Sequence, residues 1–211
     1  ARMFHALDAI AIRLADWVIA DTQQHADYYH QVFHVAQNRM SVIYVGCDDA
    51  LFFPRPKLPD SQTEHVFKIS FIGTFIPLHG VEYILGAAKQ LEHIQEIQFE
   101  FIGNGQTYQE MRKHSERLHV NNCVFCGATA LENLPTYIAK SDLCLGIFGN
   151  TEKTMRVIPN KVYHTLAMKK PLLTGDTPAI REVFRDGEHL VLCPVADDVA
   201  LAEALLRLKD N

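Results

Sequence analysis

The chain has 211 residues, 48% of them hydrophobic, enough to bury the core of one complete domain and part of a second. Its 20 basic and 25 acidic side chains give a formal charge of -5, which excludes a broad positive surface for nucleic acid or anionic lipid. No apolar run reaches the roughly 18 residues that a membrane span needs, and no signal-like segment opens the sequence. We therefore expect a cytoplasmic protein that binds any anion at a local site.

The cysteines and histidines do not predict a metal centre. The odd number of cysteines and their apolar surroundings indicate free thiols in a reducing compartment. Cys123 and Cys126 form a C-x-x-C pattern, but residues three apart on a strand point to opposite faces and would not chelate easily. His30 and His34 have a spacing that can hold a metal on a helix, yet no third ligand is near them in sequence, so a solvated face is the better interpretation.

The first 50 residues predict the end of an α/β domain. Helical spacing of apolar residues predicts a helix over 2–15, and WVIA predicts a strand at 17–20. Asp21 and Thr22 can cap a second helix that runs to about residue 36, and a strand follows at 41–46. Because this unit starts on a helix and has two strands, we interpret it as the last part of a domain.

After a proline-rich linker at 51–65, strands and helices alternate regularly to residue 211. The alternation predicts a Rossmann-like α/β fold, a parallel sheet with helices on both faces. Nearly continuous apolar runs such as LCLGIF are typical of strands buried on both faces, and ligands bind such sheets at the carboxyl edge. The predicted strands lie at 66–72, 97–102, 121–126, 142–148, 171–174 and 189–193, and the last helix at 197–209.

Three glycine-bearing loops follow strands at that edge, at 72–80, 102–106 and 126–129. Glycine after a strand lets the backbone approach a ligand and lets amides point at an anion, although a tight turn is the alternative for each loop. The second loop is not a dinucleotide fingerprint, because Tyr108 stands where the last glycine would be.

A proline-started helix among cations predicts the strongest anion site. Pro159 suits the first helical position, and the amides after it would present the positive end of the helix dipole. Lys153, Arg156 and Lys161 lie in this turn and its approach, so a diphosphate would fit there. The alternative is an exposed basic turn that makes surface ion pairs.

Two further features follow this turn. His164 shares a helical stripe with Lys161 and faces roughly the same way. Thr177 is a predicted cap with Pro178 at the first position of the next helix. We interpret Glu182 as solvated or paired with a neighbouring arginine.

Four stretches of the second part carry a family resemblance in their order and spacing: FIGTFIPLHGVEYILGAAKQL, FEFIGNGQ, FCGATALENLPTYIAKSDLCLGIFG and RVIPNKVYHTLAMKKPLLTGDTPAIREVFRDGEHLVLCP. Together they resemble the nucleotide-sugar half of a family-4 glycosyltransferase of GT-B fold. RLADWVIADTQQHADYY and SVIYVGCDDALFFP are similar to the end of that family's first domain and its linker. The resemblance therefore covers essentially the whole chain.

The resemblance implies two Rossmann-like domains that face across a cleft. It implies transfer of a sugar from a UDP- or GDP-sugar, with retention of configuration and with no metal or other cofactor. The acceptor would be a glycan or a lipid-linked molecule, and a lipid-linked acceptor would bring the protein to the inner face of the plasma membrane. We interpret the chain as part of a longer protein whose acceptor side lies elsewhere, so alone it would bind donor without transferring it.

The resemblance also assigns donor-binding positions. The first loop supplies Gly73, Thr74, Phe75, His79 and Gly80, of which Gly73 and Thr74 would approach the diphosphate. The loops expected to line the base contain Gly103, Asn104, Gly105, Cys126, Gly127 and Ala128. The phosphates would be held at Ile158, Pro159, Asn160 and Val162, and the ribose would be reached by His164.

This sequence departs from the family pattern in its charges. Many relatives have an arginine and a lysine where this chain has Thr74 and His79, and two glutamates where it has Arg156 and His164. A carboxylate accepts two hydroxyl hydrogen bonds at once, whereas a neutral imidazole accepts one. We predict Arg156 and Lys161 as catalytic residues that stabilise negative charge on the departing diphosphate.

Two functions stay open. The first is a transferase that builds a surface polysaccharide or glycolipid of the cell envelope. The second is a nucleotide-sugar-binding module without turnover, which the replaced glutamates favour. The absent fingerprint disfavours a nicotinamide-dependent enzyme, and a glycoside hydrolase needs two facing carboxyl groups, whereas cations are expected in this cleft.

Overall fold

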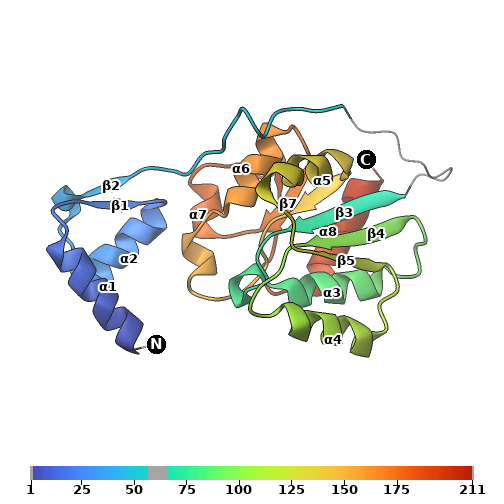
Figure 1. Ribbon diagram of the computed structural model, residues 1–211, viewed down its shortest axis with the longest axis horizontal. Helices are drawn as coiled ribbons and strands as arrows, with labels where there is room; N and C mark the ends of the chain where they lie inside the picture. The colour runs from blue at the N-terminus through green and yellow to red at the C-terminus, as the bar shows by residue number, and fades with distance from the viewer. Residues whose placement is uncertain (1, 57–65, 211) are drawn as a thin grey trace.

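The computed structural model describes residues 2–56 and 66–210, which form two units (Figure 1). The part of the predicted linker at 57–65 lies outside the described residues. The first unit contains α1 (Arg2–Leu14), β1 (Val18–Ala20), α2 (Gln23–Phe33), the 3-10 turn η1 (Gln37–Arg39) and β2 (Met40–Val42).

The second unit holds the remaining elements, and each of its six strands overlaps a predicted one. They are β3 (Phe67–Ile72), η2 (Pro77–His79), α3 (Val81–Gln90), β4 (Ile97–Ile102), α4 (Tyr108–Leu118), β5 (Cys123–Gly127), η3 (Leu131–Asn133), α5 (Leu134–Lys140), β6 (Leu143–Leu145), η4 (Thr154–Arg156), α6 (Asn160–Ala167), β7 (Leu172–Gly175), α7 (Pro178–Arg181), β8 (Val191–Cys193) and α8 (Asp198–Lys209).

The second unit is built on a six-stranded sheet in the order β5-β4-β3-β6-β7-β8, with every neighbouring pair parallel. This confirms the predicted Rossmann-like fold class. The strand order reverses between β3 and β6, and in such sheets the crevice at the carboxyl ends of the strands flanking that reversal is where ligands bind.

Side-chain alternation along the strands divides the core into two layers. Ile69 and Phe71 of β3 pack in the core that includes α3, α4 and α8, whereas Ile72 packs in the core that includes α5, α6 and α7. In Figure 1, α3 and α4 lie on one side of the sheet and α5 and α6 on the other. Both faces of the sheet are therefore covered, as the apolar strands predict.

The first unit is small. β1 and β2 pair in parallel, and its core is formed by Val18, Phe33 and Val35. Thr22 caps α2, as predicted, by accepting a hydrogen bond of 3.0 Å from the amide of His25. In Figure 1 this unit lies beside α7, with which α2 is in contact.

Several predicted boundaries differ from the structure. The predicted strand at 41–46 is only the three-residue β2, and the helix predicted to reach residue 36 ends at Phe33. The strand predicted over 142–148 ends at Leu145, and three residues later the amide of Phe148 donates to the carbonyl of His79, in the loop after β3. This bond pulls the chain after β6 toward the end of β3.

Membrane-spanning helices, metal-binding groups and cysteines can each be examined in the described residues. No helix within 2–56 and 66–210 is long and apolar enough to cross a membrane. In the same ranges, no group of three or more histidine, cysteine or acidic side chains could hold a metal ion. The five cysteines are free thiols, with Cys123 half-buried and Cys126 exposed on β5.

Candidate functional site

Two adjoining cavities lie at the carboxyl ends of the central strands. The first, of about 250 Å³, reaches the start of α6, and we call it the α6 cavity. The second, of about 290 Å³, reaches the loops after β4 and β5, and we call it the β4 cavity. They share the lining residues Ile72, Gly73, Thr74 and Leu134. The α6 cavity is completed by His79, Pro159, Asn160, Lys161 and His164, and the β4 cavity by Ile102, Gly103, Asn104, Ala128 and Thr129.

Backbone hydrogen bonds join the loops that line the two cavities. The amide of Gly73 donates to the carbonyl of Ile102 at 2.9 Å, and the amide of Gly103 donates to the carbonyl of Gly127 at 2.8 Å. A Cβ atom built at Gly103 would lie 1.9 Å from the carbonyl oxygen of Gly73, so the two loops approach more closely than a side chain allows. At Gly73 and Gly103 the lining therefore consists of backbone alone.

The start of α6 differs by one residue from the prediction. Pro159 is the residue before the first helical position, and Asn160 begins the helix. The amide of Val162 donates to the carbonyl of Pro159 at 3.0 Å, so Val162 does not offer its amide to a ligand. The amides of Asn160 and Lys161 belong to the first turn, which has no intrahelical acceptors, and both residues line the α6 cavity.

Lys161 places a cation beneath the loop that follows β3. Its buried ammonium lies 3.4 Å from the carbonyl oxygen of Gly146 and 3.8 Å from the ring centre of Phe71. A Cβ atom at Gly73 would be only 2.7 Å from the Lys161 Nζ atom. Burial lowers the pKa of Lys161 well below its usual value, because few groups compensate the charge. An anion in the cavity would supply that compensation.

His79 organises the loop rather than carrying charge. Its Nδ1 atom is hydrogen-bonded to the carbonyl oxygen of Thr74. Burial, together with the charge of Lys161, lowers the pKa of His79 to about 3. The ring is therefore neutral at physiological pH and donates its Nδ1 proton to Thr74.

His164 lines the α6 cavity with its ring held in a parallel stack. The ring of Phe52 lies 3.9 Å away between centroids, with an interplanar angle of 2°. Phe52 comes ten residues after the end of β2 and is buried in the core that includes α5, α6 and α7. Burial lowers the pKa of His164, so a neutral imidazole faces the cavity. Sequence reasoning missed Phe52, because its position 112 residues before His164 gives no local signal.

The structure does not bring Arg156 together with Lys161. Arg156 lines neither cavity; its guanidinium lies 3.6 Å from the ring centre of Tyr28 in α2. Its backbone carbonyl accepts a hydrogen bond from the hydroxyl of Thr22. A catalytic role for Arg156 stays a prediction, and this geometry does not support it.

The other predicted residues divide between the cavities and the core. Phe75 is fully buried and packs against Phe71 and Tyr108, and Ile158 and Val162 are also in the core, so none of the three presents its side chain to a ligand. The predicted residues that line neither cavity are Phe75, Gly80, Gly105, Cys126, Gly127, Ile158 and Val162, in addition to Arg156. Sequence reasoning missed the lining residues Ile72, Ile102, Thr129 and Leu134, three of which are apolar and carry no signal of ligand binding.

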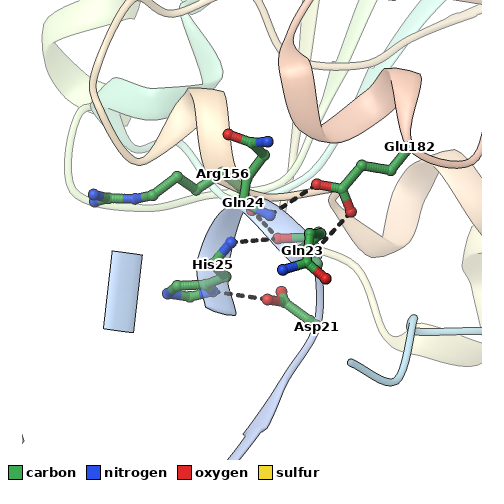
Figure 2. Close-up of polar contacts among 7 residues, drawn as sticks. Asp21, Gln23, Gln24, His25, Arg156 and Glu182 are labelled. Atoms are coloured by element: carbon green, nitrogen blue, oxygen red, sulfur yellow. Dashed lines mark hydrogen bonds and ion pairs between the residues drawn. The ribbon is translucent and has the colours of Figure 1, made fainter. Parts of the chain in front are cut away.

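Glu182 is half-buried and does not pair with a neighbouring arginine, which was one of the two predicted alternatives. Its carboxylate accepts hydrogen bonds from the amides of Gln23 and Gln24 at the start of α2 (Figure 2). The neighbouring arginines have other partners: Arg181 pairs with Asp176, and Arg185 with Glu188.

Known proteins share this sequence pattern and fold. A probable glycosyltransferase, WbjE, of Pseudomonas aeruginosa is 27% identical over 78% of this chain and 40% of its own length. An uncharacterized glycosyltransferase of Methanocaldococcus jannaschii is 21% identical over 83% of this chain and 45% of its own length. The chain thus spans less than half the length of these two relatives.

Solved structures show the same fold. Sucrose-phosphate synthase from Thermosynechococcus elongatus superposes with a TM-score of 0.83 at 19% identity, over 100% of this chain and 53% of that chain. Anabaena HepE, solved in complex with UDP and glucose, superposes with a TM-score of 0.80 at 19% identity, over 95% of this chain and 55% of that chain. The sequence model of the family described as "Glycosyl transferases group 1" matches residues 66–211. Because this match covers well over half of the sequence, the chain belongs to the glycosyl transferases group 1 and its second unit is a domain of GT-B type.

Proposed function

We propose that the second unit binds the donor of a family-4 glycosyltransferase, which transfers a sugar from a UDP- or GDP-sugar to a glycan or lipid-linked acceptor. Transfer would proceed with retention of configuration and without a metal or other cofactor. With a lipid-linked acceptor, it would take place at the inner face of the plasma membrane. The observation that carries the proposal is the pair of cavities that meet at Gly73 and Thr74, with the ammonium of Lys161 beneath them.

The two cavities suit different parts of a nucleotide. The α6 cavity combines the ammonium of Lys161 with first-turn amides, a combination that favours phosphate groups. The β4 cavity is lined by the glycine-bearing loops after β4 and β5 and suits the base. The complex of HepE with UDP supports uridine as the first nucleoside to test.

Lys161 would contribute most in the transition state. When the bond between the anomeric carbon and the phosphate oxygen breaks, negative charge grows on the departing diphosphate. A buried cation that is already in place stabilises this charge without reorganisation. His164, neutral and held by Phe52, would meet the ribose with one acceptor or one donor, where a carboxylate would accept two hydroxyl bonds.

Lys161→Met is expected to have opposite effects on the free and the nucleotide-bound protein. The lowered pKa of Lys161 means that the unfolded chain binds a proton more readily than the folded one, so folding the charged side chain costs free energy at pH 7. Removing the charge should therefore stabilise the free protein by about 1–3 kcal/mol. It should also abolish most of the stabilisation by UDP.

Thermal unfolding with UDP, GDP and their sugar conjugates measures both effects. A nucleotide at about 100 times its dissociation constant should add roughly 2.7 kcal/mol to the stability of the wild-type protein. Lys140→Met, which removes an exposed charge at the end of α5, is the matched control and should respond to nucleotide as the wild type does. Absence of any nucleotide effect on the wild type, or full retention of it in Lys161→Met, would contradict the proposal.

A binding module without turnover is the second candidate. It is favoured by the engagement of Arg156 with Tyr28 and by the imidazole at position 164. Nucleotide-sugar binding without transfer, measured on a chain that includes a complete acceptor domain, would support the module. Transfer of the sugar would support the enzyme.

A further inference from the structure

Glu182 connects the two units at the start of α2. Its carboxylate oxygens accept from the amide of Gln23 at 2.7 Å and from the amide of Gln24 at 2.8 Å, as Figure 2 shows. The hydroxyl of Tyr44, which follows β2, donates to the same carboxylate at 3.1 Å. Glu182 therefore holds two segments of the first unit, although 158 and 159 residues separate it from Gln24 and Gln23.

This carboxylate completes the cap of α2. The first turn of a helix has amides without intrahelical acceptors and the positive end of the helix dipole. Thr22 accepts from the amide of His25 with its hydroxyl and from the amide of Ala26 with its carbonyl. The two remaining amides bond to Glu182, and hydrogen bonds to an ionised acceptor are among the stronger ones in proteins.

A second contact lies next to the first. The hydroxyl of Thr22 donates to the carbonyl of Arg156, and the guanidinium of Arg156 stacks on Tyr28 of α2. Arg156 is the last residue of η4 and stands three residues before Pro159, where α6 is about to begin. The start of α2 thus holds both the residue that follows α7 and the segment that leads to the α6 cavity.

We propose that Glu182 is a positioning residue that clamps α2 against α7 and η4. The clamp fixes the first unit relative to the sheet and steadies the approach to the α6 cavity. The part of this inference that concerns ligand affinity rests on the proposed nucleotide function. The clamp itself rests only on the contacts of Glu182, Arg156 and the start of α2.

Hydrogen exchange of the backbone tests the clamp without any ligand. In Glu182→Ala, the amides of Gln23 and Gln24 lose their acceptor, so peptides covering 18–28 should exchange at least about tenfold faster. Peptides covering 151–163, which include η4, should exchange faster as well. Glu182→Gln keeps one oxygen acceptor and should recover part of the protection.

Glu188→Ala is the matched control. Glu188 is exposed, and it forms ion pairs with Arg185 and His189 of its own loop. Its removal therefore deletes a carboxylate six residues away from Glu182 without touching α2. Exchange in 18–28 and 151–163 should match that of the wild type. Unchanged exchange in Glu182→Ala, or equal acceleration in Glu188→Ala, would overturn the clamp.

Titration with UDP then separates positioning from simple support of the fold. The dissociation constant for UDP should rise severalfold in Glu182→Ala and recover partly in Glu182→Gln. The thermal unfolding midpoint of the second unit should stay near that of the wild type. An unchanged dissociation constant in Glu182→Ala would overturn the positioning role. If the wild type binds neither UDP nor GDP, the proposed function fails. The clamp is still tested in that case, because faster hydrogen exchange in Glu182→Ala supports it and unchanged exchange overturns it.

Discussion

At the scale of single residues, the candidate site is distinguished by two buried basic side chains, those of Lys161 and His79. Lys161 and His79 both approach Gly73, one from α6 and one from η2. Burial lowers the pKa of both residues. Burial therefore disfavours the charged form of Lys161 in the free protein, and a bound anion would favour that form, so ligand binding should stabilise the folded protein.

His79 should make the stability of the protein depend on pH below neutrality. Its pKa is about 3 in the folded protein and near 6.5 in an unfolded chain. Between these values the unfolded state binds a proton that the folded state does not, so stability falls as the pH is lowered. The expected contribution is about 1.4 kcal/mol for each pH unit across this window.

The measurement is urea unfolding between pH 7 and pH 4 for the wild type and His79→Asn. Asparagine keeps a donor for the carbonyl of Thr74 but does not titrate, so its stability should fall less steeply with pH. His93→Asn, at an exposed position, is the control. Equal slopes for the wild type and His79→Asn would show that His79 is not held neutral by the fold.

The sequence predicts those site residues that a short local pattern marks, such as a glycine after a strand or a lysine at a helix start. Gly73 follows a strand and Lys161 lies at a helix start, and both line the α6 cavity. Arg156 and Glu182 have comparable local signals, but their partners lie in α2, more than 120 residues earlier. Such long-range contacts depend on how the two units are placed, which a local pattern does not contain.

At the scale of elements, the carboxyl ends of β3 and β4 are joined backbone to backbone. The sequence predicts where the strands lie because apolar runs alternate with amphipathic helices, although β6 is four residues shorter than predicted. The start of α6 was misplaced by one residue, because proline suits both the residue before a helix and its first position. The close contact of Gly73 and Gly103 was not predicted, since the sequence shows two glycines after strands but not their distance.

Gly103→Ala is expected to destabilise this edge of the sheet. The added methyl group would lie 1.9 Å from the Gly73 carbonyl oxygen, and Gly103 has a φ of 139° that favours glycine. The backbone of one loop must move, which should cost about 2 kcal/mol or more of the free energy of unfolding. Nucleotide stabilisation should also fall, because the wall of the β4 cavity moves.

Gly46→Ala provides the control for this substitution. No described atom lies within 4 Å of a Cβ atom built at Gly46, and its φ is not in the left-handed region. Its free energy of unfolding should stay within about 1 kcal/mol of the wild type. Urea unfolding measures both variants, and a Gly103→Ala protein as stable as Gly46→Ala would contradict the close approach.

At the scale of the whole molecule, the two units differ in size and burial. The second unit buries two large cores on either side of six strands, whereas the first has a two-stranded sheet and a small core around Val18, Phe33 and Val35. A two-stranded sheet is marginally stable by itself. The first unit also exposes large apolar side chains to solvent, namely Leu7, Ile10, Leu14, Trp17, Ile19 and Ile43.

The first unit should therefore unfold before the second, and the chain carries a natural probe for it. Trp17, between α1 and β1, is the single tryptophan of the sequence. Tryptophan fluorescence therefore reports the first unit alone, whereas circular dichroism reports mainly the larger second unit. In urea, we expect the fluorescence transition at a lower concentration than the dichroism transition. UDP should move the dichroism midpoint more than the fluorescence midpoint, and Glu182→Ala should widen the gap because the clamp couples the units. Coincident midpoints in the wild type would mean that the contacts of α2 with α7 and η4 are strong enough to make the two units one cooperative structure.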